Sequence, residues 1–225
     1  MLQASTLQFL TDLKNNNNRS WLEAHRPAYE AAKADFAGLV GQVLAGLRDL
    51  DPDLARSPLE PKNCIYAMNR DIRFSADKSP YKTSMGAWFN PGGKKTPTAG
   101  YFLHVEPGGG SFLAGGLYQP EPDKLALIRQ EIDYNLTGFE QVLHEPSFKQ
   151  YFGGLRPEDA LKRPPKGYEP DNPAIEYLKL KSFTRSRPLT DEQLTEPTLP
   201  SHVLTVCRSL VPLVHYLNRV APQSA

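Results

Sequence analysis

Cysteine, net charge and long apolar runs are all scarce in this sequence. Its two cysteines, Cys64 and Cys207, lie far apart, and neither has a histidine or a second cysteine nearby at the spacing of zinc ligands. A disulfide framework and a metal site are therefore not expected, and a reducing cytoplasm is the expected compartment. No apolar run approaches the length of a membrane-spanning helix, and the first ten residues lack the pattern of a secretory signal.

The overall composition is that of an ordinary globular protein. Apolar residues make up 40% of the chain and charged residues 23%, which argues against disordered, collagen-like and coiled-coil classes. A chain of 225 residues buries enough surface to fold without disulfides, so we expect one domain over residues 1–225. The 21 prolines exceed the usual share and predict short elements joined by rigid turns.

The formal net charge of +1 conceals an uneven distribution. Residues 62–95 carry seven basic and two acidic side chains, and residues 162–187 carry seven basic and three acidic ones. These two segments have net charges of +5 and +4, so the rest of the chain sums to −8. Two basic segments in an acidic body indicate a local anionic partner rather than long-range attraction to a polyanion.

Four stretches carry apolar residues at helical spacing: residues 5–13, 27–50, 122–134 and 202–220. Shorter helices are predicted between the last two stretches. The first and last helices lie near the two ends of the chain, so they are expected to flank the elements of the middle of the chain.

Strand patterns fill the middle of the chain. Residues 85–90, 100–106 and 111–118 alternate or are rich in strand-forming residues, and glycine- and proline-rich links join them into an antiparallel meander. Residues 63–74 are interpreted as a strand running into a loop, and 181–189 as a strand or extended segment. The predicted fold class is α+β, an antiparallel meander with helices packed on it and the N-terminal and C-terminal helices flanking the sheet.

The densest polar cluster is the stretch 69–82, NRDIRFSADKSPYK. Its spacing R-D-x-R-F-x-x-x-D-K-x-x-Y resembles the signature of a family of conserved hypothetical proteins, bacterial with fungal members embedded in longer proteins, that carries a domain of unknown function. The family's pattern is R-x-x-R-D-x-R-F-x-x-x-[DN]-K-x-x-Y, and its first arginine corresponds here to Ala67. If that arginine belongs to a site, this chain lacks it, or Lys62 or another cation substitutes.

Other landmarks of the same family occur in order along nearly the whole chain. The resemblance implies membership of the family but no activity, so the functional argument rests on the chemistry of the residues. The landmarks are N-N-R-S-W at 17–21, G-Y-F-L-H at 100–104, G-G-L-Y-x-P at 115–120 and L-K-R-P-P-K-G-Y at 161–168.

The cluster predicts an anion pocket. If residues 69–74 are extended, Arg70 lies beside Ile72 and Phe74 on one face, and partial desolvation strengthens its binding to a carboxylate or phosphate. The ligand-binding candidates here are two bidentate donors and two point charges: Arg70, Arg73, Lys78 and Lys82.

A structural interpretation of the same cluster stays open. Arg70, Asp71, Arg73 and Asp77 hold two charges of each sign and would form an internal salt-bridge network that fixes the loop.

A second basic run follows at residues 162–168. Its two prolines hold it extended and present Lys162, Arg163 and Lys166 with little ordering entropy left to lose. These three complete the ligand-binding candidates, and a shared pocket requires that the two basic segments converge. The alternative is a solvated lysine-rich turn.

Catalytic candidates are few. Asp71, Tyr81 and His104 are the side chains able to perform acid/base work near the arginines. No phosphate-binding loop, nucleophile elbow or zinc-protease motif is present in the sequence, and the five histidines are dispersed. No metal or cofactor is expected, and whether the protein is an enzyme is left open.

The favoured hypothesis is a cytoplasmic protein or enzyme that binds a small anion, a phosphate or a carboxylate, in a basic pocket. One alternative is a protein-interaction or scaffold domain. Another is a single-strand nucleic-acid module, since aromatic residues interleave with the basic ones, although the near-neutral charge argues against it. No membrane partner is expected, and the oligomeric state is left open.

Overall fold

The computed structural model describes residues 1–94, 96–155 and 160–221, so Lys95 of the first basic segment lies outside the described residues. The chain divides into two units. Unit 1 comprises residues 1–94, 102–113 and 188–205, and unit 2 comprises residues 95–101, 114–187 and 206–225. Boundaries between the units fall inside three strands and one helix. The expectation of one domain stays a prediction.

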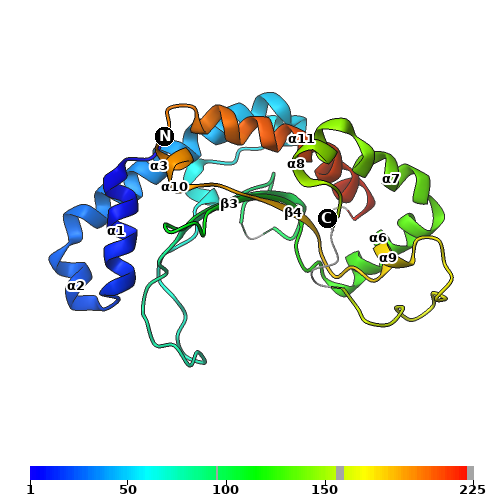
Figure 1. Ribbon diagram of the computed structural model, residues 1–225, viewed down its shortest axis with the longest axis horizontal. Helices are drawn as coiled ribbons and strands as arrows, with labels where there is room; N and C mark the ends of the chain where they lie inside the picture. The colour runs from blue at the N-terminus through cyan, green and yellow to red at the C-terminus, as the bar shows by residue number, and fades with distance from the viewer. Residues whose placement is uncertain (95, 156–159, 222–225) are drawn as a thin grey trace. The chain divides into compact units, whose positions relative to one another are not determined.

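Unit 1 is built around α3 (Arg26–Leu50), the long helix predicted from its apolar spacing. Its buried face carries Phe36, Val40 and Leu47, and α1 packs beside it, as Figure 1 shows. Proline at the second helical position starts α3, where the missing amide proton costs nothing. The shorter helices of unit 1 are α1 (Ala4–Asn15), α2 (Arg19–Ala24), α4 (Pro52–Arg56), α5 (Pro61–Cys64) and α10 (Asp191–Thr195).

Unit 2 holds a second set of helices, of which α6 contacts both α7 and α9. The described members are α6 (Pro122–Tyr134), α7 (Leu136–His144), α8 (Pro146–Phe152) and α9 (Ile175–Leu178). The C-terminal helix α11 (Leu199–Val220) begins in unit 1 and ends in unit 2. Among the described helices, none combines the length and the apolar character that a bilayer crossing requires.

Four strands form one antiparallel sheet in the order β1-β2-β3-β4, which confirms the predicted meander and the α+β class. The fourth strand is the segment that was interpreted as a strand or extended. The bounds are β1 (Met85–Phe89), β2 (Gly100–Val105), β3 (Phe112–Leu117) and β4 (Phe183–Pro188).

In β1 and β2 every second side chain is buried, and the side chains between them keep part of their surface exposed. This is the alternation expected of a sheet with a core on one side only. The buried set in unit 1 is Met85, Ala87, Phe89, Leu103 and Val105. The set on the other face, called the open face below, is Gly86, Trp88, Phe102 and His104.

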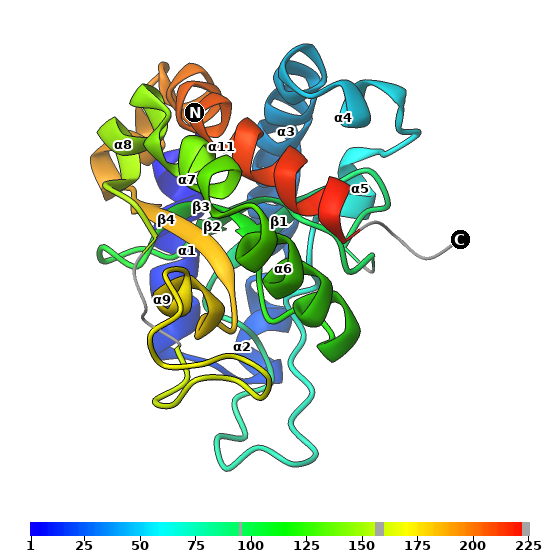
Figure 2. The same cartoon turned by 90° about the vertical axis from the view of Figure 1, so that its right-hand side faces the viewer.

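The prediction of a strand within residues 63–74 is wrong. Helix α5 ends at Cys64, and the chain then forms a long loop with isolated bridges from Ile65 to Ala87 and from Asn69 to Tyr81. The physical reason is that this polar run has no alternating apolar face to bury, and Phe74 is 95% exposed. Figures 1 and 2 show this segment projecting from unit 1.

Candidate functional site

The projecting segment, residues 66–84, is called the basic loop below. Backbone hydrogen bonds pair its two arms: the Tyr66 amide donates to Gly86 (2.9 Å), the Lys82 amide to Met68 (2.7 Å) and the Arg70 amide to Pro80 (2.9 Å). The loop therefore has an ordered base beside β1 and a tip, residues 70–79, that begins at the last of these bonds.

A side chain from another part of unit 1 fixes the base. The Asn17 side-chain amide donates to the backbone carbonyl of Tyr81 (2.8 Å), and the backbone amide of Tyr81 donates to the side-chain oxygen Oδ1 of Asn17 (3.1 Å). Asn17 lies in the link between α1 and α2, so these two bonds tie the returning arm of the loop to that link. Tyr81 takes part in this clamp through its backbone.

The arginines at the tip are paired inside the loop. Arg70 donates to the Asp77 carboxylate and to the Ser79 carbonyl (3.2 Å). Arg73 binds Asp71 through Nε (2.9 Å) and Nη2 (2.6 Å). Lys78 donates to the Ile72 carbonyl (3.0 Å). These contacts form the salt-bridge network of the structural interpretation.

Both carboxylates respond to these contacts. Hydrogen bonds from Ser79, followed by the Arg70 guanidinium, hold the pKa of Asp77 well below its usual range. The Arg73 guanidinium and then its amide lower the pKa of Asp71. Asp71 is thus an ionised, arginine-bound carboxylate at neutral pH, which is a poor general base.

A pocket of about 320 Å³ lies at the base of the loop, on the open face of the sheet. We call it the sheet pocket. Its lining residues all belong to unit 1: Tyr66, Ala67, Lys82, Ser84, Gly86, Phe102 and His104. Ala67 is the position that corresponds to the first arginine of the family pattern. Lys62, named above as its substitute, does not line the pocket and is paired with Glu60 (2.5 Å).

Lys82 differs from the other cations of the loop. Its side chain is half-buried, and its ammonium lies 5.5 Å from the centre of the Tyr66 ring. Within the described ranges, no hydrogen-bond acceptor for this ammonium is found. A cation in contact with a ring face and lacking an acceptor retains most of its capacity to bind an anion.

His104 lies on the same open face of the sheet, and a carboxylate orients its ring. Its Nε2 is 3.2 Å from Glu106 Oε2, and its ring stacks on Phe112 at 4.8 Å. The side chain is 19% exposed. With Nε2 bonded to Glu106, the other ring nitrogen is available to a ligand. Of the three catalytic candidates, His104 lines the sheet pocket, whereas Asp71 and Tyr81 do not.

The second basic run belongs to unit 2. Lys162, Arg163 and Lys166 are exposed. The Tyr168 amide donates to the Pro165 carbonyl (3.2 Å), and Gly167 between them has a φ of +93°, which favours glycine. The run is therefore irregular and ends in a turn, whereas its prolines had suggested an extended segment. Convergence of the two basic segments stays a prediction.

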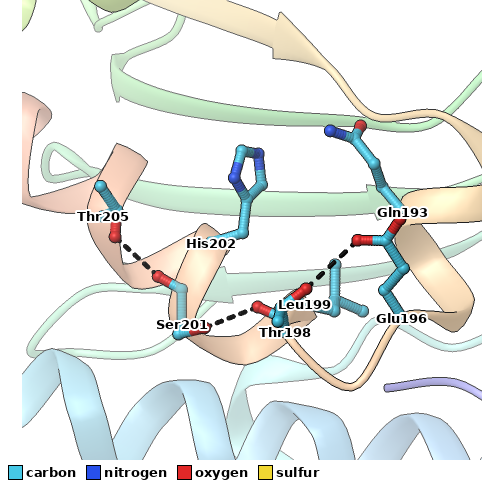
Figure 3. Close-up of a pocket in the computed structure, with 7 residues that line it drawn as sticks. All are labelled: Gln193, Glu196, Thr198, Leu199, Ser201, His202 and Thr205. Carbon is cyan, nitrogen blue, oxygen red and sulfur yellow. Dashed lines mark hydrogen bonds between the residues drawn. The ribbon is translucent and has the colours of Figure 1, made fainter.

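A second pocket in unit 1, of about 230 Å³, lies where α10 leads into α11 (Figure 3). Most of its hydroxyls are already bonded locally: Thr198 to Glu196 (3.2 Å), Ser201 to the Thr198 carbonyl (2.7 Å) and Thr205 to the Ser201 carbonyl (2.8 Å). No motif in the sequence marks this pocket. Its contacts are those of a helix start, so we assign it no function.

The sequence of the whole chain was compared with known proteins. The model of a family described as "conserved hypothetical protein (DUF2461)" matches residues 5–216. The chain belongs to this family. Neither the comparison with curated proteins nor the comparison with solved structures finds a match. Membership of DUF2461 confirms the resemblance in the sequence, and the function is argued from the sheet pocket.

Proposed function

We propose that this DUF2461 protein binds a small anionic ligand, a phosphate or a carboxylate, in the sheet pocket. The observation that carries the proposal is the half-buried Lys82 ammonium, which lines the pocket and has no acceptor within the described ranges. A bound anion would supply that acceptor, in surroundings where apolar rings reduce the screening by water.

The rest of the pocket supports a small ligand. Its volume is at the lower end of the range of about 300–1,000 Å³ that small-molecule sites occupy. Aromatic walls, the Ser84 hydroxyl and the His104 imidazole give the combination of apolar surface and a few polar groups that such sites use.

In this proposal the arginines at the tip have a structural role. Arg70 and Arg73 already hold carboxylates, so an anion would have to displace an intramolecular partner to bind there. Lys162, Arg163 and Lys166 are not needed for the binding step.

The test is a thermal-shift screen with inorganic phosphate and with phosphorylated and carboxylated metabolites, followed by calorimetry on each compound that stabilises the protein. Lys82→Met keeps the length of the side chain and removes its charge. It is expected to weaken binding by at least about tenfold. Lys62→Met is the matched control, because Lys62 is exposed and paired at the surface. Equal binding by both variants would contradict the proposal.

A further inference from the structure

Aromatic residues on and beside the open face lie in contact with one another and extend beyond the sheet pocket, and we call this set the aromatic row. The Phe102 ring is central, with ring centres of its neighbours 5.8–6.2 Å away. The neighbours are Tyr66, Trp88, His104 and Phe112. All of these residues belong to unit 1.

These rings are not core residues. The core of unit 1 takes the alternate side chains of β1 and β2, whereas Tyr66 is 36% exposed and Trp88, Phe102 and Phe112 keep part of their surface exposed. A set of partly exposed rings beside polar groups is a feature of ligand-binding surfaces.

Gly86 in the floor of the pocket allows the Phe102 ring to lie close to the backbone of β1. A methyl group at this position would lie 3.2 Å from two atoms of the Phe102 ring and 3.7 Å from the Tyr66 ring. The φ of Gly86 is not in the left-handed region, so its backbone does not require glycine. What glycine contributes here is the close approach of the Phe102 ring, which a side chain at position 86 would displace.

We infer that the ligand of the sheet pocket is a monophosphate ester of an aromatic ring compound, as in a nucleoside monophosphate, with its ring packed on Phe102. The inference rests on the proposed function. The Lys82 ammonium lies 5.5 Å from the centre of the Tyr66 ring, so a phosphate on Lys82 places the remainder of its molecule against the aromatic row. Stacking on an aromatic side chain is the means by which proteins bind planar bases without reading their edges.

Calorimetry with adenosine monophosphate, pyridoxal phosphate, ribose 5-phosphate and inorganic phosphate tests this inference. The wild-type chain is expected to bind at least one of the two ring compounds about tenfold more tightly than ribose 5-phosphate, since one stack on an aromatic side chain contributes about this much. Comparison of the two ring compounds distinguishes a nucleotide from another phosphorylated ring.

Variants distinguish the contribution of the ligand's ring to binding from that of its phosphate. The methyl group of Gly86→Ala displaces the Phe102 ring, and Phe102→Leu removes it, so each is expected to abolish the tenfold preference and leave the affinity for ribose 5-phosphate unchanged. Lys82→Met is expected to weaken binding of all the phosphates. Gly38→Ala is the control, because nothing lies within 4 Å of the added methyl group. Circular dichroism verifies that each variant is folded.

The outcomes are distinct. If the ring compounds bind no better than ribose 5-phosphate, the inference is wrong and the anion site stands. If no phosphate binds the wild-type chain, the inference is wrong, and if the carboxylated metabolites of the screen do not bind either, the proposed function fails as well. If a single-stranded oligonucleotide binds far more tightly than every monophosphate, with a steep salt dependence, the aromatic row is a nucleic-acid surface and the inference is overturned.

Discussion

The tip and the base of the basic loop both hold cationic side chains, and they differ in what those side chains contact. At the tip, Arg70 and Arg73 bind the carboxylates of Asp77 and Asp71. At the base, Lys82 lies beside aromatic rings, without an acceptor in the part of the chain that the structure describes. On the proposed function, the local density of basic residues is a poor guide to anion binding, and we expect the number of cations without an acceptor to be a better one.

Burial also distinguishes the two ends. Cys64, which directly precedes the base, is fully buried, whereas Phe74 at the tip is 95% exposed. The base is consequently part of the folded body of unit 1, and the tip is a solvated structure held by its own ion pairs. The predictions that follow test this difference, from the largest effect to the smallest.

The largest expected difference between the base and the tip is in the reactivity of a thiol. Burial raises the pKa of Cys64 from 9.0 to about 11, so at pH 8 its thiolate fraction is on the order of 100-fold below that of the unfolded chain. Because the folded pKa is the higher one, the stability from the neutral thiol is present below pH 9.0 and is lost as the pH rises through about 11.

Ala76→Cys places a comparison thiol at the exposed tip. Labelling by a chromogenic disulfide at pH 8 is expected to be fast at position 76 and slow at Cys64. Equal rates at the two positions would show that the base is as solvated as the tip.

The next largest effect is expected on the free energy of unfolding when the Asn17–Tyr81 clamp at the base is removed. Asn17→Ala removes both hydrogen bonds to the Tyr81 backbone and is expected to lower the free energy of unfolding by about 1–3 kcal/mol. Asn16→Ala is the control, because the Asn16 amide bonds only within the end of α1, to Asp12. Urea titrations of both variants measure the difference, and a loss at position 17 no greater than that at position 16 would contradict the clamp.

The hydrogen bonds from Ser79 and the ion pair with Arg70 predict that the stabilisation by Asp77 at the tip depends on pH. The pKa of Asp77 is held below its usual value of 3.8, so the stabilisation is complete above pH 3.8 and is lost as the pH falls through the folded pKa. A carbon-detected titration is expected to show the Asp77 carboxylate still ionised at pH 3.8. In Arg70→Met the midpoint is expected to rise, and an unchanged midpoint would mean that Arg70 does not contribute.

The smallest effect is expected at Phe74. Because the ring is almost fully exposed, Phe74→Ala is expected to change the free energy of unfolding by no more than about 0.5 kcal/mol. Thermal or urea unfolding measures this change. A larger loss would show that the ring contacts the fold and that the tip is not the solvated structure described above.

Much of the fold follows from local patterns in the sequence. The apolar spacing of residues 27–50 predicted α3, and the alternation in 100–106 predicted the buried and open faces of β2. The strand prediction for 63–74 failed because mixed apolar residues there suggested a strand, whereas the segment is ordered by backbone bonds to Pro80, Lys82 and Gly86, which lie beyond its end in the chain.

The site could be predicted only in part. Lys82 and His104 were candidates, since basic and titratable residues can be read from sequence, but their meeting depends on the pairing of the two loop arms beside β1 and β2. Gly86, Ser84 and Phe102 were missed because they carry no charge, and only the three-dimensional arrangement shows that they line one pocket. The density of arginines favoured the tip as the site, although their acidic partners Asp71 and Asp77 lie beside them in the sequence.

The central claim is that the anion site lies at the base of the basic loop and not at its tip. The direct test measures, side by side, the affinity of the wild-type chain, Lys82→Met and Arg73→Met for a phosphorylated compound from the thermal-shift screen. The account predicts that Lys82→Met loses at least about tenfold in affinity while Arg73→Met binds as the wild type does. Loss of binding in Arg73→Met with full affinity in Lys82→Met would contradict it.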